Sequence, residues 1–251
     1  MLGLEGYLLA FIRFSTFIFA MPLLTRRGIP PQIKIGLAGF MAVLVAPPLT
    51  YTGDFSRYWI IMVIQEIGVG LLLAFAVTLI FASIQFSGQL VDFPIGFGMA
   101  TVFDPQSGLQ MPVFSQFYTL LATVIFFAVD AHLWILRALC QSYQYLPING
   151  IFALDFTLEA FAQLGKNLFV IGFQIAAPII GTILLVDVAL GVVTRAVPQL
   201  NVFVLGFPIK NLLGLFVIIL AIPVFVALVA KLFAYDGILM EIIYGLIQSG
   251  T

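Results

Sequence analysis

The chain has 251 residues, of which 63% are hydrophobic and only 8% are charged, and its mean hydropathy is +1.19. Soluble domains carry charge on about a quarter of their residues, so this composition excludes a water-exposed globular protein and indicates a polytopic membrane protein. The net charge of −1 comes without a block of Lys and Arg, which argues against a nucleic-acid surface, and the single cysteine, Cys140, excludes an internal disulfide and a cysteine-based metal cluster.

The sequence predicts an all-α fold built on six apolar segments. Each segment is long enough to cross a bilayer, for which about 20 apolar residues suffice. Prolines and glycines interrupt several of them, so the path is expected to include helical hairpins that do not cross. The segments are approximately residues 4–24, 33–51, 58–86, 112–140, 165–194 and 207–235.

The first segment is predicted to be a helix of the mature protein. It carries Arg13 in its middle and lacks the basic start and small-residue cleavage site of a signal peptide. The loop that follows, residues 25–34, holds the densest positive charge of the chain in Arg26, Arg27 and Lys34. By the positive-inside bias this loop is expected to face the cytoplasm.

Charged residues lie within or at the ends of the apolar segments, where they are expensive to keep. One interpretation is an ion or proton relay, and the other is a set of helix–helix salt bridges in a packed bundle. A relay usually needs several converging acids, whereas these charges alternate in sign, so the structural interpretation is favoured. The residues are Arg13, Glu66, Asp130, Arg137, Asp187 and Arg195.

The only histidine, His132, is a weak candidate for catalysis. Asp130 is two residues away and so falls on a different side of a helix. No carboxylate has metal-ligand spacing to the histidine, no Gly-rich phosphate loop is present, and no nucleophile has a base beside it in the sequence. The sequence therefore argues against an enzyme and predicts neither a cofactor nor a metal site. His132 with Trp134 is better explained as an interfacial anchor.

The middle connector, residues 88–117, is too apolar for a solvated loop. Its prolines and glycines, from Pro94 to Pro112, are expected to forbid a continuous helix. Irregular backbone at membrane depth is tolerated only inside protein or along a cavity, and a hydrophobic constriction can close a pore by dewetting. From spacing alone the connector is equally well interpreted as a plug or gate and as a re-entrant packing loop.

A second interruption lies in PQLNVFVLGFPIKNLLGL, residues 198–215. Pro198 and Pro208 each remove a backbone donor and are predicted to end or kink a helix. Such a broken segment could be the binding site of a small-molecule or ion transporter, but the two inverted halves usual for transporters are not apparent. The polar residues in and just before the segment are Arg195, Gln199, Asn201 and Lys210.

The chain ends in EIIYGLI within residues 236–251, which is predicted to be a short amphipathic tail that lies on the interface or packs on a neighbour. No internal repeat, low-complexity tract or linker divides the sequence. We therefore expect a single membrane domain over residues 1–251.

Several long strings of this sequence resemble the FliR family of the bacterial flagellar protein-export gate. They are RFSTFIFAMPLLTRRGIPPQIKIGLA, ATVFDPQSGLQMPVFSQFYTLLATVIFF and DVALGVVTRAVPQLNVFVLGFPIKNLLGL. The resemblance covers nearly the whole chain, and DPQSG and PQLNVFVLGFP are its most specific motifs. The family also includes the equivalent subunit of virulence-type injectisomes, and GFP at Gly206 to Pro208 is more similar to the flagellar branch.

The resemblance implies a non-enzymatic, structural and gating subunit of a type III export channel. Such a subunit assembles with FliP-family and FliQ-family proteins into a helical gate, near FlhB-family and FlhA-family proteins. It sits in the bacterial inner membrane at the flagellar basal body and passes unfolded flagellar proteins. Apolar faces would then meet other subunits as well as membrane lipid, which makes six crossings an unsafe count.

The resemblance also assigns roles to individual residues. The family's loop between the middle helices is expected to plug the closed channel, and it corresponds to the connector 88–117. The occluding side chains would be Met99, Phe103 and Met111, with Phe114 as a further large apolar side chain, and Asp104 and Pro105 would shape the turn. Gln199 and Asn201 would satisfy backbone groups freed by Pro198, which is a role in assembly.

Overall fold

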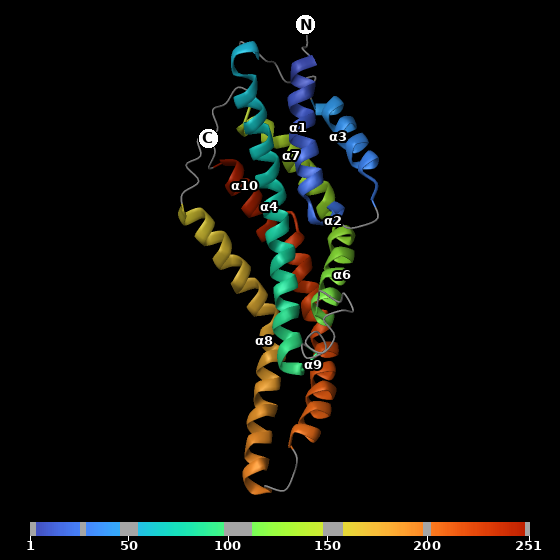
Figure 1. The fold of residues 1–251 in the computed structure, drawn as a ribbon, viewed down its shortest axis with the longest axis vertical. Coiled ribbons are helices and arrows are strands. Elements are labelled where there is room, and N and C mark those ends of the chain that lie inside the picture. The colour runs from blue at the N-terminus through green and yellow to red at the C-terminus, as the bar shows by residue number, and fades with distance from the viewer. Residues whose placement is uncertain are drawn as a thin grey trace. The chain divides into compact units, whose positions relative to one another are not determined.

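The structure, a computed structural model, describes residues 4–25, 29–45, 55–97, 112–147, 158–197 and 202–248. All regular elements in these ranges are helices, as the composition predicted (Figure 1). In chain order they are α1 (Leu4–Ala20), α2 (Pro22–Thr25), α3 (Pro31–Val45), α4 (Phe55–Ile95), α6 (Val113–Ala128), α7 (Ala131–Tyr145), α8 (Leu158–Ala196), α9 (Val202–Phe233) and α10 (Ile238–Gln248).

Three helical stretches of the described chain are long and apolar enough to cross a membrane: Trp59–Ile95, Gly165–Ala196 and Leu205–Ile247. The pair of α6 and α7 makes a fourth if it counts as one span. Helix α1 has 17 residues and α3 has 15, which at 1.5 Å per residue leaves both short of a hydrocarbon core of about 30 Å. Within the described residues, the first two predicted segments therefore do not form helices long enough to cross, and residues 46–51 of the second segment lie outside the described residues.

Prolines set helix boundaries in this part of the chain. Pro22 divides the first segment, because α1 ends at Ala20 and α2 begins at Pro22. Pro31 is the first residue of α3, the helical position at which a missing N–H removes no hydrogen bond.

Elsewhere, prolines are tolerated inside the helices. Pro178 lies within α8, and Pro208 and Pro223 lie within α9. Of the two predicted effects, Pro208 does not end a helix, since α9 begins at Val202 and continues through it for 32 residues in all. A kink at this proline stays a prediction. Each internal proline removes one of many hydrogen bonds, and a long apolar helix packed in a membrane protein can absorb that loss. Pro198 lies outside the described residues.

A left-handed residue divides the fourth predicted segment, residues 112–140, into two helices. Asp130 has φ 57° and ψ 23°, and it is the only non-glycine residue with positive φ in the described chain. Asp tolerates this conformation better than most residues because its short side chain can hydrogen-bond locally. The Asp130 carbonyl then accepts the N–H of Leu133 at 2.9 Å, which begins α7. The segment is therefore not one straight span.

The described chain groups into two compact units, each described by itself. The first unit comprises residues 1–80, 129–164 and 232–251. In it α1 lies beside α3, and α10 lies beside α7 (Figure 1). Helix α10 falls within the predicted amphipathic tail: Leu239 and Ile243 are fully buried, while Glu241 is exposed. A single functional domain over the whole chain stays a prediction.

The second unit comprises residues 81–128 and 165–231, and the C-terminal part of α4 is its central helix. Close approaches at glycine bring the other helices onto it. A Cβ at Gly88 would lie 2.3 Å from Cα of Ser115 in α6, and one at Gly172 of α8 would lie 2.6 Å from the Phe86 ring. Gly214 of α9 meets α4 in the same way. At Gly88 an added Cβ would collide with backbone, which cannot move aside, whereas at Gly172 and Gly214 the nearest atoms belong to side chains.

Gly70 of α4 offers a test of this packing in the first unit. A Cβ at Gly70 would lie 2.7 Å from the carbonyl oxygen of Arg13 in α1, which no side-chain rotation can relieve. We expect Gly70→Ala to lower the midpoint temperature of thermal unfolding in detergent by several degrees, as overpacking costs about 1–3 kcal/mol.

Gly68→Ala is the matched control, because no heavy atom lies within 4 Å of a Cβ at Gly68. Alanine is the better helix former by about 1 kcal/mol, so this variant should unfold at the wild-type temperature or slightly above it. Equal losses in the two variants would contradict the close contact between α1 and α4.

Candidate functional site

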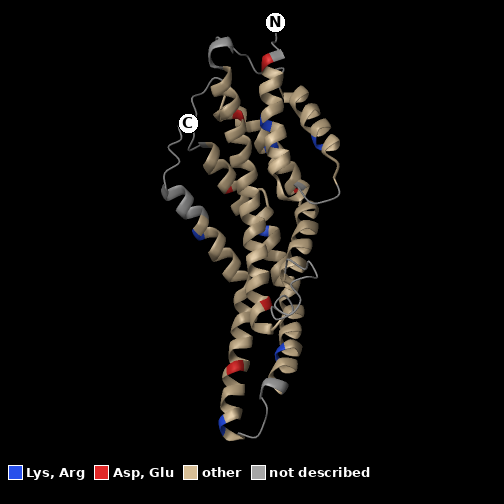
Figure 2. Ribbon diagram, viewed as in Figure 1, with Lys and Arg blue, Asp and Glu red and all other residues tan. Residues whose placement is uncertain are grey.

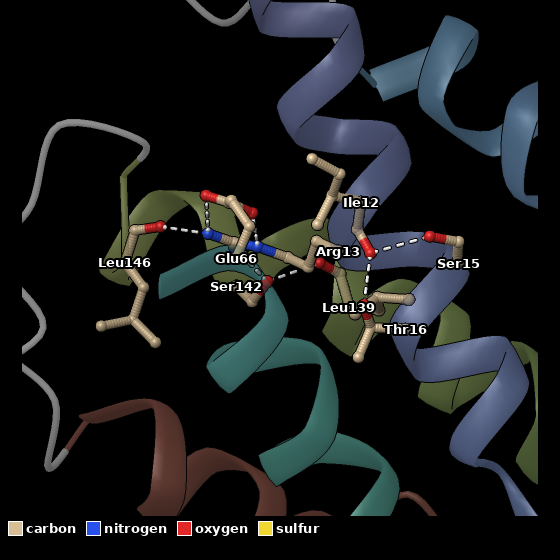
Figure 3. A network of polar contacts seen from close by, with 8 residues as sticks. All are labelled: Ile12, Arg13, Ser15, Thr16, Glu66, Leu139, Ser142 and Leu146. Carbon is tan, nitrogen blue, oxygen red and sulfur yellow. Dashed lines mark hydrogen bonds and ion pairs between the residues drawn. The ribbon is translucent and has the colours of Figure 1, made fainter. Parts of the chain in front are cut away.

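Charged groups are sparse along the helices (Figure 2), and one of the most deeply buried is Arg13 on α1, which is 1% exposed. Its guanidinium faces the carboxylate of Glu66 on α4, which is 2% exposed (Figure 3). Nε donates to Oε2 at 2.6 Å and Nη2 donates to Oε1 at 2.9 Å. This bidentate pairing, with two parallel N–H···O bonds, is a particularly strong geometry for an arginine and a carboxylate. It joins α1 to α4.

The same guanidinium also binds α7. Nη1 donates to Ser142 Oγ at 2.8 Å, and Nη2 donates to the carbonyl oxygen of Leu146 at 3.0 Å (Figure 3). Ser142 Oγ in turn donates to the carbonyl of Leu139 at 2.7 Å, and the guanidinium carbon lies 3.8 Å from the centre of the Tyr143 ring. Arg13 thus ties three helices of the first unit together with nearly every donor it has. A charge held by so many contacts is suited to structure rather than to proton movement.

A second ion pair joins the long helices of the second unit. Lys210 of α9 pairs with Asp187 of α8, and their side chains are 27% and 45% exposed. Arg195 is exposed and lies in the last turn of α8, where a positive charge interacts favourably with the negative end of the helix dipole. Asp130 and Arg137 are exposed in the first unit. Among the described residues, no group of three or more His, Cys, Asp or Glu side chains could hold a metal ion.

The connector between α4 and α6 is shorter than predicted. Helix α4 continues through Pro94 to Ile95, because a proline in the last turn removes only one hydrogen bond, and α6 begins at Val113. Gly96 then ends α4 with φ +102°, and its N–H bonds to the carbonyls of Asp92 and Phe93 at 3.2 Å. Left-handed glycine is a common helix ending. Residues 98–111 lie outside the described residues, and with them Met99, Phe103, Asp104, Pro105 and Met111.

Asp92 holds the two ends of this connector together. Its side chain is 1% exposed, and its carboxylate accepts the backbone N–H of Phe114 at 3.1 and 3.0 Å and that of Ser115 at 3.1 Å. These are first-turn N–H groups of α6, which have no partner within their own helix. Asp92 therefore caps the start of α6 from the end of α4, and the partial positive charge of the α6 N-terminus balances its own.

The contacts around Asp92 are close as well. Ser115 Oγ donates to the carbonyl of Gln85 at 3.0 Å, and Gln85 lies about two helical turns before Asp92 on α4. Phe114 is 7% exposed, and its ring meets that of Phe97 edge-on, with 5.6 Å between ring centres. The described ends of the connector are thus joined by apolar contact, by backbone approach and by one carboxylate.

Sequence reasoning missed Asp92, Ser142 and Tyr143. An acid near a helix C-terminus is unfavourable to the dipole, and nothing local shows that another helix begins beside it some 20 residues later. One signal was present: residues 87–111 contain no Lys or Arg, so an acid among them needs a partner that is not a basic side chain of that segment. Three predicted residues of the second interruption, Pro198, Gln199 and Asn201, lie outside the described residues.

The Arg13–Glu66 pair predicts strongly non-additive mutations. Glu66→Leu leaves a buried guanidinium without its counter-charge and should lower the free energy of unfolding by about 3–5 kcal/mol. The double variant Arg13→Met/Glu66→Leu should lose clearly less than the sum of the two single variants, as measured by thermal unfolding in detergent. Lys210→Met, in the half-exposed pair, should cost about 1 kcal/mol or less. Additive losses at Arg13 and Glu66 would contradict the pairing.

Comparison with known proteins places the chain. The family model described as bacterial export proteins, family 1, matches residues 4–235. The flagellar biosynthetic protein FliR of Bacillus subtilis (strain 168) is 35% identical over 238 residues, which are 91% of this chain and 90% of the relative. FliR of Escherichia coli (strain K12) is 30% identical over 233 residues, 92% and 89% of the two chains. The surface presentation of antigens protein SpaR of Shigella flexneri is 29% identical over 217 residues, 83% and 81%. The chain belongs to the FliR family of bacterial export proteins.

Proposed function

We propose that this protein is a structural and gating subunit of the flagellar type III export channel, which passes unfolded flagellar proteins across the bacterial inner membrane. The observation that carries the proposal is the extent of the similarity. Proteins named for flagellar biosynthesis match this chain at 35% and 30% identity over about nine-tenths of its length. The similarity runs along nearly the whole chain, which supports the same role for this protein.

The uncovered surface of the long helices supports a role within a larger assembly. The apolar part of the Trp59–Ile95 stretch is 61% buried inside the chain, but the corresponding parts are only 33% buried in Gly165–Ala196 and 22% buried in Leu205–Ile247. Large side chains such as Leu185, Leu212 and Val224 are more than 60% exposed. Lipid or other subunits must cover these faces. We assign the cover to FliP-family and FliQ-family subunits, with FlhB-family and FlhA-family proteins nearby at the basal body.

The connector between α4 and α6 is the proposed plug of the closed channel. Met99, Phe103 and Met111 would occlude the path, and Asp104 and Pro105 would shape the turn. The clamped ends support this assignment, because the carboxylate of Asp92 and the ring of Phe97 hold the described end of α4 against the start of α6. Phe114, packed on Phe97, would mark the base of the plug.

The remaining predicted residues are assigned to assembly. Pro198, Gln199 and Asn201 would link α8 and α9 to neighbouring subunits at the break between the two helices, with Arg195 beside them. The pair of Lys210 with Asp187 supports this, since it holds the two helices to each other within the second unit. No catalytic step is proposed for this chain, because an export component of this family acts as a passage.

A virulence-type injectisome is the second candidate system. SpaR of Shigella flexneri, a surface presentation of antigens protein, matches 83% of this chain at 29% identity. The flagellar assignment has the stronger support, since the flagellar relatives are more similar over a larger share of the chain.

Deleting the gene in frame distinguishes the two systems. We expect hook protein and flagellin to disappear from the culture medium on immunoblots, motility to be lost, and plasmid-borne wild-type protein to restore all three. Normal flagellin export without this chain would contradict the flagellar role. Loss of virulence-type secretion in that strain would then assign the protein to an injectisome.

Shortening the connector tests the plug. Replacing residues 98–111 with a shorter Gly/Ser linker should make cells that contain the assembled complex leak potassium, because the occluding side chains are gone. A length-matched replacement that keeps Met99, Phe103 and Met111 is the control and should leak less. Unchanged permeability with a normal amount of assembled complex would refute the plug assignment.

A further inference from the structure

We propose that Asp92 is the positioning residue of the closed gate: its carboxylate fixes the start of α6 against the end of α4, and its loss lets the closed channel leak. The inference rests on the proposed function and adds to it the residue that keeps the gate in place. Unlike the connector, Asp92 and both of its partners lie within the described chain.

The first step of the argument is that Asp92 binds main chain rather than a side chain. Its three hydrogen bonds go to the N–H groups of Phe114 and Ser115. No Lys or Arg of the described chain lies within 4 Å of its carboxylate. The partial positive charge that balances the carboxylate is therefore that of the α6 N-terminus. The carboxylate is bonded to the end of a helix and not to a side chain that can change its rotamer.

The second step is that the site is buried and closely packed around this contact. Asp92 is 1% exposed and Ser115 is fully buried. The backbone of α6 approaches Gly88 so closely that a Cβ there would lie 2.5 Å from the Ser115 nitrogen. Water cannot readily replace the carboxylate, so without it the first-turn N–H groups of α6 stay unpaired or the helix start moves. Displacement of this start moves one end of the connector relative to the other.

The third step separates the carboxylate from general packing. Ser115 takes part in two contacts: its N–H binds Asp92, and its hydroxyl binds the Gln85 carbonyl at 3.0 Å. Ser115→Ala removes the hydroxyl contact and leaves both N–H groups for Asp92. Asp92→Ala removes the carboxylate and leaves the hydroxyl contact. The two variants therefore break different links between the same two helices.

The experiment measures potassium leak from non-growing cells that express the tagged protein with its partner subunits, with the assembled complex quantified on native gels. Hydrogen bonds to a buried charge are strong enough that Asp92→Ala should raise the leak about tenfold over wild type at equal complex. Asp92→Asn keeps one acceptor oxygen and should leak less than Asp92→Ala. Ser115→Ala should match wild type. Flagellin export should continue in all three, because the path itself is intact.

The variant with the shortened connector is run in parallel to keep the two proposals apart. A leak from that variant with a tight Asp92→Ala channel would overturn the role of Asp92 and leave the plug standing. Tight channels in both would overturn the plug and the inference together. A leak from Ser115→Ala equal to that of Asp92→Ala would also overturn the inference, since packing rather than the carboxylate would then hold α6. Loss of the assembled complex in both Asp92 variants would reassign Asp92 to assembly.

Discussion

A charge enclosed by apolar helices must find all of its partners within the protein, and Arg13 meets this requirement through contacts to three helices. Glu66 supplies the counter-charge, Ser142 and Leu146 supply neutral acceptors, and Tyr143 supplies a ring face. Apolar contacts alone allow helices to slide or rotate with little penalty. A guanidinium with a fixed set of donors does not, so the pairing sets the registration of α1, α4 and α7 within the first unit.

In the second unit, close contacts at glycine residues, rather than a buried ion pair, set how the helices pack against one another. Glycines let α6, α8 and α9 come close to α4, and close approach allows dispersion to accumulate where lipid competes with any apolar surface. The hydrogen bonds between Asp92 and the start of α6 then fix the position of α6 along α4, which packing shape alone would leave less precisely defined. Much of the apolar surface of α8 and α9 is not covered by the chain itself, and such surface suits contact with lipid or with other proteins.

The class of fold could be read from composition, and most helices lie close to their predicted ranges. The errors concern what prolines do. Pro22 and Pro31 divide or begin helices, whereas Pro178, Pro208 and Pro223 lie inside them, and the local sequence does not distinguish the two outcomes because the surrounding packing decides them. The turn at Asp130 was missed for a similar reason, since a left-handed residue other than glycine has no strong sequence signal.

The candidate site shows the same division. Arg13 and Glu66 could be singled out because a charge in an apolar run is conspicuous, but their pairing across 53 residues of chain could not be derived from spacing. Asp92 was not singled out, although it is as deeply buried, because its partners are main-chain N–H groups that every residue type provides. Contacts that use the backbone are invisible in a sequence until the fold brings the segments together.

This difference between the two buried carboxylates has an evolutionary consequence. Glu66 binds a side chain, so a change at Glu66 can be accepted once Arg13 has also changed. The two positions should therefore vary together among related proteins. Asp92 binds backbone N–H groups, which are present whichever residues other than proline occupy positions 114 and 115. Its position should therefore covary with no basic residue, and a suppressor of its loss should arise as a new cap for α6 rather than as a reversed charge.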